Sequence, residues 1–126
     1  MKAVVIQSKG SFNPEPGEGH FRGTVLREQL SEVPPSPELR GSFVQFKDGA
    51  FTKLHQHTGG QLLYVTEGDG FVEFGDGTCY DLTPGTRVVI PPGEFHRHGA
   101  KPRADLEHLA VTAGETYWWD ADSKEH

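Results

Sequence analysis

A chain of 126 residues with 18 acidic and 12 basic side chains carries a formal net charge of −6, and its Lys and Arg residues form no cluster. Without a basic patch we exclude nucleic acid and the membrane surface as partners and expect a small-molecule substrate. No apolar run approaches the roughly 20 residues of a membrane span, and residues 1–10 lack the apolar core of a signal peptide. Because Cys79 is the only cysteine, no internal disulfide can form, and we expect a cytoplasmic protein.

The first third of the chain predicts little regular structure. Short strands are expected over residues 3–6 and 24–27, and the Gly- and Pro-rich residues 8–20 between them predict an irregular arm. Residues 31–38 contain three prolines within four positions, Pro34, Pro35 and Pro37, so this segment cannot donate a regular ladder of backbone hydrogen bonds. This segment is therefore predicted to be a loop that leads into the main domain.

From Gly41 onward, runs of β-branched and aromatic residues alternate with turn signals, as in a sandwich or barrel. Asp69-Gly70 and Asp76-Gly77 predict tight hairpins, and Pro84-Gly85 and Pro92-Gly93 fit type II turns. No segment has a helical apolar period, so the predicted fold class is all-β, closed or doubled into a jelly roll that protects its edges. The predicted strands cover residues 42–46, 52–57, 61–67, 71–74, 78–82, 87–90, 95–98 and 105–111.

The length of the chain favours one domain with one core. We expect a single domain over residues 1–126. Its predicted parts are an N-terminal arm with strands (1–40), a barrel core (41–112) and a C-terminal tail (113–126).

Five of the seven histidines lie close together in the sequence, at positions 55, 57, 96, 98 and 108. His55 and His57 are two positions apart on a predicted strand, so they project from one face and can share a metal ion. On the next strand Gln61 lies on the same face as Leu63 and Val65, where a buried amide needs a partner. A metal ion bound through the carbonyl oxygen or a neighbouring backbone group could be that partner.

Two blocks of residues resemble the two signature motifs of the cupin family. In the first block Gly49, His55, His57, Gln61 and Gly68 stand at the motif's spacings, with Gln61 where the family has Glu. In the second block the matching residues are Gly85, Pro91, Gly93 and His96, and Gly99 replaces an Asn. The resemblance spans residues 49–99. It implies a double-stranded β-helix, a homodimer, and one divalent metal ion per chain held by His55, His57, Gln61 and His96.

Residues 55–65, 96–100 and 107–111 are also similar to a compact bacterial cupin subgroup that carries Gln in place of Glu. That subgroup includes manganese-dependent hydroxynitrile lyases, so the resemblance implies manganese. The donor set itself suits Mn, Fe, Co, Ni or Zn equally. A neutral Gln61 would leave a divalent site at +2 rather than +1, which makes the metal a stronger Lewis acid.

His108 and His98 are the candidate catalytic residues. His108 shares a strand face with Leu106 and Ala110, where a polar ring is costly unless it is used. We assign it as the general acid/base, kept neutral by a nearby dication and a partly dry pocket. His98 shares the inward face of His96, and its role stays open between lining the barrel and acting directly. The two other histidines, His20 and His126, are expected to be bystanders.

Several other residues have structural interpretations. Cys79 has no neighbouring base or second cysteine, so it is expected to be a small buried residue. Leu62 and Tyr64 have the opposite parity to Gln61, which predicts that they face outward and cover a homodimer interface. Trp118 and Trp119 are expected to close an end of the barrel or an interface.

Three functions from different classes follow. The leading hypothesis is a mononuclear metal-dependent enzyme acting on a small oxygen-bearing organic molecule, most specifically a carbon–carbon lyase like the hydroxynitrile lyases. A redox-metal dioxygenase fits the same imidazole ligands. A non-catalytic barrel that binds a small ligand or sugar is the third, because fold does not decide function.

Overall fold

The computed structural model describes residues 15–16, 20–29 and 39–119. The strand expected at 3–6, the loop expected at 31–38 and His126 lie outside these residues. The described residues form strands and no helix, which confirms the all-β prediction. They accordingly contain no helix long and apolar enough to cross a membrane.

Eleven strands make up the described part of the chain, and every pairing between them is antiparallel. In chain order they are β1 (Glu15–Pro16), β2 (Phe21–Gln29), β3 (Arg40–Thr52), β4 (His55–His57), β5 (Gln61–Gly68), β6 (Gly70–Phe74), β7 (Cys79–Leu82), β8 (Arg87–Ile90), β9 (His96–Ala100), β10 (Leu106–Thr112) and β11 (Thr116–Trp118).

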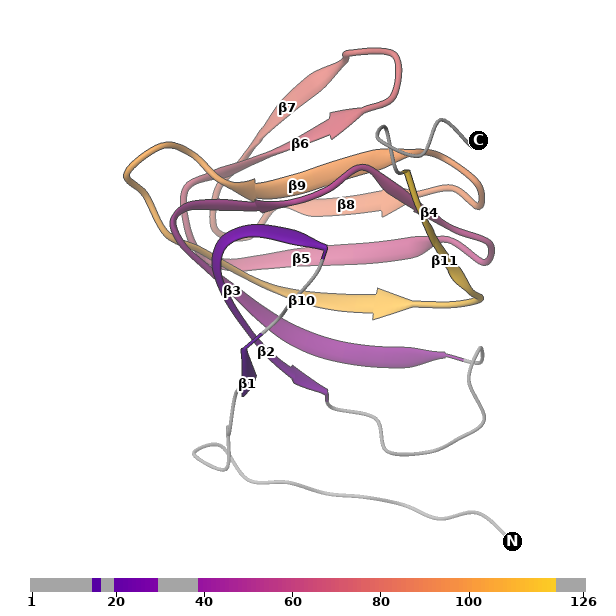
Figure 1. Ribbon diagram of the computed structural model, residues 1–126, viewed down its shortest axis with the longest axis horizontal. Helices are drawn as coiled ribbons and strands as arrows, with labels where there is room; N and C mark the ends of the chain where they lie inside the picture. The colour runs from indigo at the N-terminus through magenta and orange to yellow at the C-terminus, as the bar shows by residue number, and fades with distance from the viewer. Residues whose placement is uncertain (1–14, 17–19, 30–38, 120–126) are drawn as a thin grey trace, which may run out of the picture.

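The strands curl into a jelly-roll barrel (Figure 1). The main path of the sheet runs β11-β4-β9-β3-β10-β5-β8, with β2 on β3 and the β6–β7 hairpin on β9. Neighbours such as β3 and β10 are far apart in sequence, as expected when strands double over rather than meander. The barrel thereby brings β4, β5, β9 and β10, which carry the candidate site residues, around one interior.

β3 is longer than predicted, because it continues to Thr52 where the expected strand ended at residue 46, and the next strand, expected from residue 52, begins only at His55. The predicted break falls at Asp48 and Gly49, which have φ values of +47° and +78° inside the strand. Their backbone N–H groups donate to the side chain of Asp105 and the carbonyl oxygen of Ala104, each at 2.9 Å. Asp48 and Gly49 therefore bend β3 without ending it. The bend lets β3 pair first with β10 and then with β9, where Phe51 lies opposite Gly99.

The glycine turns follow the prediction at Gly77, Gly85 and Gly93, all of which have positive φ. The hairpin expected at Asp69-Gly70 is different: Gly70 begins β6, and Gly68 takes the positive φ of +97°. A Cβ at Gly68 would also collide with the carbonyl oxygen of Asp105. A similar steric reason explains why residue 99 is glycine where the family motif has Asn. A side chain there would collide with β3, which passes too close to β9.

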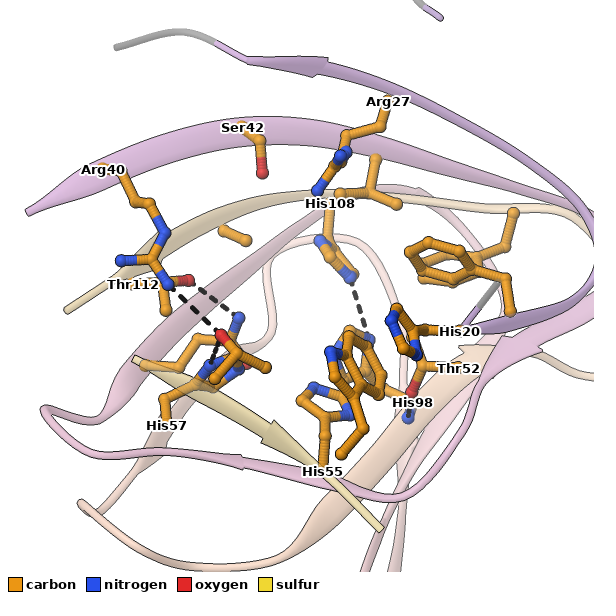
Figure 2. Close-up of a pocket in the computed structure, with 17 residues that line it drawn as sticks. His20, Arg27, Arg40, Ser42, Thr52, His55, His57, His98, His108 and Thr112 are labelled. Atoms are coloured by element: carbon orange, nitrogen blue, oxygen red, sulfur yellow. Dashed lines mark hydrogen bonds between the residues drawn. The ribbon is translucent and has the colours of Figure 1, made fainter. Parts of the chain in front are cut away.

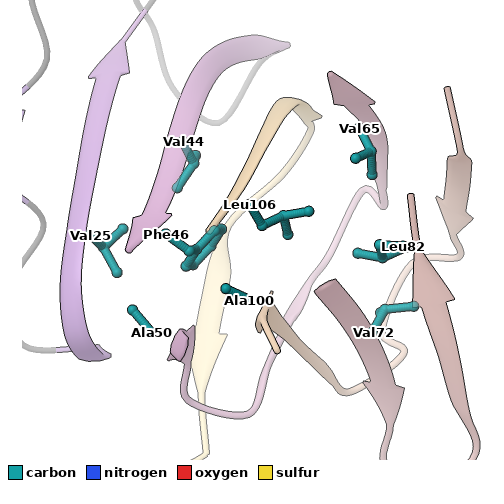
Figure 3. Packing of buried hydrophobic residues seen from close by; sticks show 9 residues of the cluster. All are labelled: Val25, Val44, Phe46, Ala50, Val65, Val72, Leu82, Ala100 and Leu106. Carbon is teal, nitrogen blue, oxygen red and sulfur yellow. The ribbon is translucent and has the colours of Figure 1, made fainter. Parts of the chain in front are cut away.

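The inward-facing residues divide the interior into an apolar end and a polar end. On β10 they change from Leu106 through His108 and Ala110 to Thr112, alternating with partly exposed residues. The apolar end is a cluster around the fully buried Phe46 (Figure 3). It consists of Val25, Val44, Phe46, Ala50, Val65, Val72, Leu82, Ala100 and Leu106. Burying such side chains is worth about 1.5–3 kcal/mol each, so this end holds the polar end in place.

The outer surface confirms one expectation and corrects another. Leu62 and Tyr64 face outward as predicted, and Val89, opposite Leu62 on β8, is also exposed. Cys79, which was expected to be buried, is an exposed free thiol. The reason is that, among the described strands, β7 pairs with β6 alone, and of its four residues only Leu82 is buried.

Candidate metal centre

The polar end of the barrel opens into a cavity of about 300 Å³ (Figure 2). This volume equals about ten water molecules at roughly 30 Å³ each, which suits a small organic substrate. Five of the six predicted site residues line the cavity, and the sixth, His96, is fully buried with its ring 4.3 Å from that of His55. The five are His55, His57, Gln61, His98 and His108.

His55 and His96 lie directly opposite each other on β4 and β9. The Nδ1 of His55 is 2.7 Å from the carbonyl oxygen of Lys53, and the Nδ1 of His96 is 3.0 Å from that of Glu94. Because a carbonyl oxygen can only accept, both Nδ1 atoms carry the proton and donate it. Each ring therefore keeps a lone pair on Nε2, the atom through which an imidazole binds a metal.

Gln61 places its carbonyl oxygen toward His96. Its amide nitrogen donates to the Thr112 hydroxyl at 2.9 Å, and its Oε1 is 3.0 Å from the Nε2 of His96. Both of these atoms carry lone pairs and neither carries a proton, so they repel unless a proton or a cation lies between them. A divalent ion fits this position, since it accepts electron pairs from both atoms.

His57 presents a buried nitrogen without a partner. Its Nδ1 is 2.8 Å from the Thr116 hydroxyl, whereas no described residue hydrogen-bonds to its buried Nε2. A buried lone pair without a partner costs free energy, and a metal ion would remove that cost. The donors of His55, His57, Gln61 and His96 thus have the chemistry that a divalent cation needs.

His98 is an alternative to His57 as the third imidazole ligand of the metal ion. One donor atom from each of His55, His96 and His98 lies within 4.8 Å of the others, a grouping that does not contain His57. The Nε2 of His98 is buried and, among the described residues, also has no partner. The assignment of His57 rather than His98 as a ligand therefore stays a prediction.

His108 and His98 are hydrogen-bonded to each other. The Nε2 of His108 is 3.1 Å from the Nδ1 of His98, so one of these two nitrogens carries a proton and the other accepts it. His108 is fully buried, and its ring lies 5.3 Å from that of Phe46. This pair connects the apolar core with the polar end of the cavity.

Burial lowers the pKa of every one of these imidazoles. It lowers the pKa of His57 and of His108 to about 4. Burial, and then the neighbouring His96, holds the pKa of His55 well below its ordinary value, and the pKa of His98 is lowered in the same way by burial and by His108. The rings are therefore neutral at pH 7, as metal ligands and general bases must be.

The low pKa of His108 predicts a loss of stability in acid. The unfolded ring binds a proton below about pH 6.5 and the folded ring only below about 4, so stability falls as the pH drops between these values. In protein from which a chelator has removed the metal, we expect His108 to lower the free energy of unfolding by about 2 kcal/mol between pH 7 and pH 5. Urea unfolding at both pH values checks this. The variant His108→Gln is expected to lose less stability than the wild type, and an equal loss would contradict it.

His20 and Trp118 also line the cavity, which the sequence did not indicate for His20. The His20 ring stacks on that of Trp118 with centroids 4.1 Å apart, and Trp118 lies 4.4 Å from the His55 ring. His20 therefore lies at the candidate site rather than apart from it. Trp118 reaches this place because β11 pairs with β4, where Trp118 lies opposite His55.

The remaining polar lining comes from residues that no motif marked. Thr52, Thr112 and Thr116 face the cavity, as do Arg27 and Arg40. Arg40 donates to the carbonyl oxygen of Gly114 at 2.7 Å and to the Thr116 hydroxyl at 3.2 Å. The register that places these residues at the cavity joins strands far apart in sequence, so spacing along the chain could not reveal it.

The fold and the site together define an all-β barrel with an interior ring of histidines. The family model described as a cupin domain matches residues 42–112. The chain belongs to the cupin family.

Known proteins of this family resemble the chain to different degrees. It is 40% identical to an (R)-mandelonitrile lyase of Granulicella tundricola over 91 residues, which are 72% of this chain and 70% of that protein. It is 27% identical to an acireductone dioxygenase of Puccinia graminis over 66% of this chain and 49% of that protein. A solved cupin-like protein of Thermotoga maritima superposes with a TM-score of 0.79 at 31% identity, covering 96% of this chain and 92% of that one.

Proposed function

We propose that this chain is a metal-dependent lyase that breaks or forms a carbon–carbon bond next to an oxygen-bearing carbon, most specifically a hydroxynitrile lyase. The observation that carries the proposal is the Gln61 carbonyl oxygen facing the Nε2 of His96, beside neutral imidazoles in a small cavity. The 40% identical mandelonitrile lyase supports it.

His55, His57, Gln61 and His96 are the proposed ligands of one ion per chain. Manganese is the expected metal, with Fe, Co, Ni or Zn as the other ions that these donors suit. The ion would supply Lewis-acid chemistry, polarising the substrate oxygen and holding cyanide. Hydrogen bonds fix the orientation of the proposed ligand side chains. The carbonyl oxygens of Lys53 and Glu94 orient His55 and His96, and the hydroxyl of Thr112 orients Gln61.

His108 is the proposed base for the substrate hydroxyl. Its ring is neutral near pH 7, and its hydrogen bond to His98 gives the proton a second position when His108 has accepted one. Trp118, stacked on His20, limits the access of water from the mouth. In cyanohydrin cleavage His108 would take the hydroxyl proton as the bond to the nitrile carbon breaks, and the proton would later leave with cyanide as hydrogen cyanide.

The proposal is tested by supplying metal-loaded protein with cyanohydrins, including mandelonitrile, and following aldehyde and cyanide release. We expect cyanide release that stops when a chelator is added and returns with the metal. A panel of enediols and catechols with an oxygen electrode tests the second candidate, a dioxygenase, which the acireductone dioxygenase relative favours. Oxygen uptake without cyanide release would replace the lyase by the dioxygenase. Tight ligand binding without turnover on either panel would indicate a non-catalytic barrel.

The variant Gln61→Glu is expected to keep its metal and change its rate substantially. A carboxylate would lower the charge of the site by one and weaken the Lewis acid. The carboxylate also has no N–H to donate to Thr112, whose contact with Gln61 is 2.9 Å long. Metal content and turnover of the variant check this prediction. Unchanged turnover at full metal content would contradict the role of site charge.

A homodimer is the proposed assembly, formed by the outward face of β5 and β8. Leu62, Tyr64 and Val89 are 38%, 43% and 75% exposed there, and adjacent apolar side chains of this kind favour an interface. Light scattering at micromolar concentration is expected to report a dimer, and the variant Tyr64→Glu a monomer. Tyr80→Glu, on an exposed tyrosine of β7, is the matched control and is expected to stay dimeric. A monomeric wild type would contradict the proposal.

A further inference from the structure

The cavity has a charge opposite to that of the whole chain. The protein carries a net charge of −6, yet among the described residues that line the cavity two are arginines and none is acidic. Figure 2 shows Arg40, Ser42 and Arg27 along one wall, with His55 and His57 on the wall facing them. A divalent ion held without a carboxylate ligand would add two further positive charges. This electrostatic arrangement attracts an anion.

Arg27 is available to such an anion. It projects from β2, and Figure 2 shows its guanidinium directed toward the side of the cavity where His108 lies. Within the part of the chain that the structure describes, no hydrogen bond or ion pair is formed by its guanidinium. A planar guanidinium carries five N–H donors that match a carboxylate in a two-point contact.

Arg40 has a different setting at the other end of the same wall. Two of its N–H groups are used by Gly114 and by Thr116, whose hydroxyl also contacts His57. Its remaining donors and its charge are still beside the cavity. Arg40 is therefore connected through Thr116 to the proposed metal ligand His57, whereas Arg27 is not. Arg27 can accordingly be substituted to test anion binding without disturbing the proposed metal site.

We propose that the substrate of this site carries a carboxylate, bound by Arg27 with Arg40 beside it, so that the lyase acts on a small cyanohydrin that also bears a carboxylate group. This inference rests on the proposed function for the position of the reacting carbon, between the arginine wall and the histidines. A cavity of about 300 Å³ accommodates an acid of this kind. A carboxylate also matches the flat donor fork of arginine in a cavity that is otherwise lined by rings and hydroxyl groups.

The test compares mandelate with mandelamide, a neutral molecule of nearly the same size, by titration calorimetry on the full-length metal-loaded protein. We expect mandelate to bind about tenfold or more tightly than mandelamide, the effect of about one charge-assisted contact. Arg27→Gln is expected to weaken mandelate binding about tenfold and to leave mandelamide unchanged. Arg22→Gln, the same charge change at an exposed arginine of β2 that does not line the cavity, is the control and is expected to bind mandelate as the wild type does.

Three results would overturn the inference: equal binding of mandelate and mandelamide, equal effects of Arg27→Gln and Arg22→Gln, or inorganic phosphate binding more tightly than mandelate. Because binding is read as heat and not as turnover, failure of this inference and failure of the lyase proposal give different results.

Discussion

The variant His108→Ala is expected to keep its metal and its fold while turnover on an established substrate falls by about 10²–10⁴, the usual effect of removing a positioned acid/base. His108 is fully buried, and its pKa of about 4 keeps the ring neutral and able to accept a proton at pH 7. Its Nε2 contacts His98 rather than a proposed ligand. Removing the ring therefore takes away proton transfer and leaves the metal donors in place.

Turnover, metal content and circular dichroism of His108→Ala are measured together. A smaller fall in KM than in kcat would place the loss in the chemical step. If the variant remained fully active, the acid/base role would pass to His98 or to metal-bound hydroxide. If it lost its metal, the proposed ligand set would be wrong.

The second large effect is expected from His96→Ala, which is predicted to lose both the metal and the activity. The His96 ring is fully buried against that of His55, and its Nε2 faces the carbonyl oxygen of Gln61, so its removal takes away the nitrogen that would share the ion with Gln61. Removing one of four donors would weaken binding of a divalent ion by orders of magnitude. Elemental analysis after dialysis measures the loss, and retention of a full equivalent of metal would contradict it.

The same assay decides between His57 and His98 as the third imidazole. We expect His57→Ala to lose metal and His98→Ala to retain it, because His57 stands at a ligand position of the first cupin motif and His98 stands at no motif position. The opposite result would assign the metal to the grouping of His55, His96 and His98, whose donor atoms lie within 4.8 Å of one another.

Alternating patterns along single strands were enough to predict most of the fold. The inward face of β5, from Gln61 to Val65, and the outward direction of Leu62 and Tyr64 follow from parity alone. Asp48 and Gly49 mark a bend and not an end of β3, because their N–H groups find partners in residues 104 and 105, which the local sequence cannot show. Cys79 was mispredicted for a similar reason, since the exposure of β7 depends on which strands it does not pair with.

The candidate site was predictable only where the chemistry is carried by closely spaced residues or by the two motifs. The partner of the Gln61 amide is Thr112, which is 51 residues away and meets it only through the β5–β10 register. His20 comes from just before β2, Arg27 from β2 and Arg40 from β3, and nothing in their local sequence marks them as cavity residues. Sequence therefore indicated the proposed ligands, and the structure added what orients them and which further residues line the cavity.

The central claim is that the polar end of this barrel holds one catalytic metal ion, and metal analysis tests it most directly. Protein purified without chelators and without affinity nickel is analysed for all first-row metals. We predict close to one divalent ion per chain, with manganese the expected metal, and with His–metal distances of about 2.0–2.3 Å in a crystal structure of the loaded protein. A barrel that binds no divalent ion, with the Gln61 carbonyl oxygen turned away from His96, would contradict the claim.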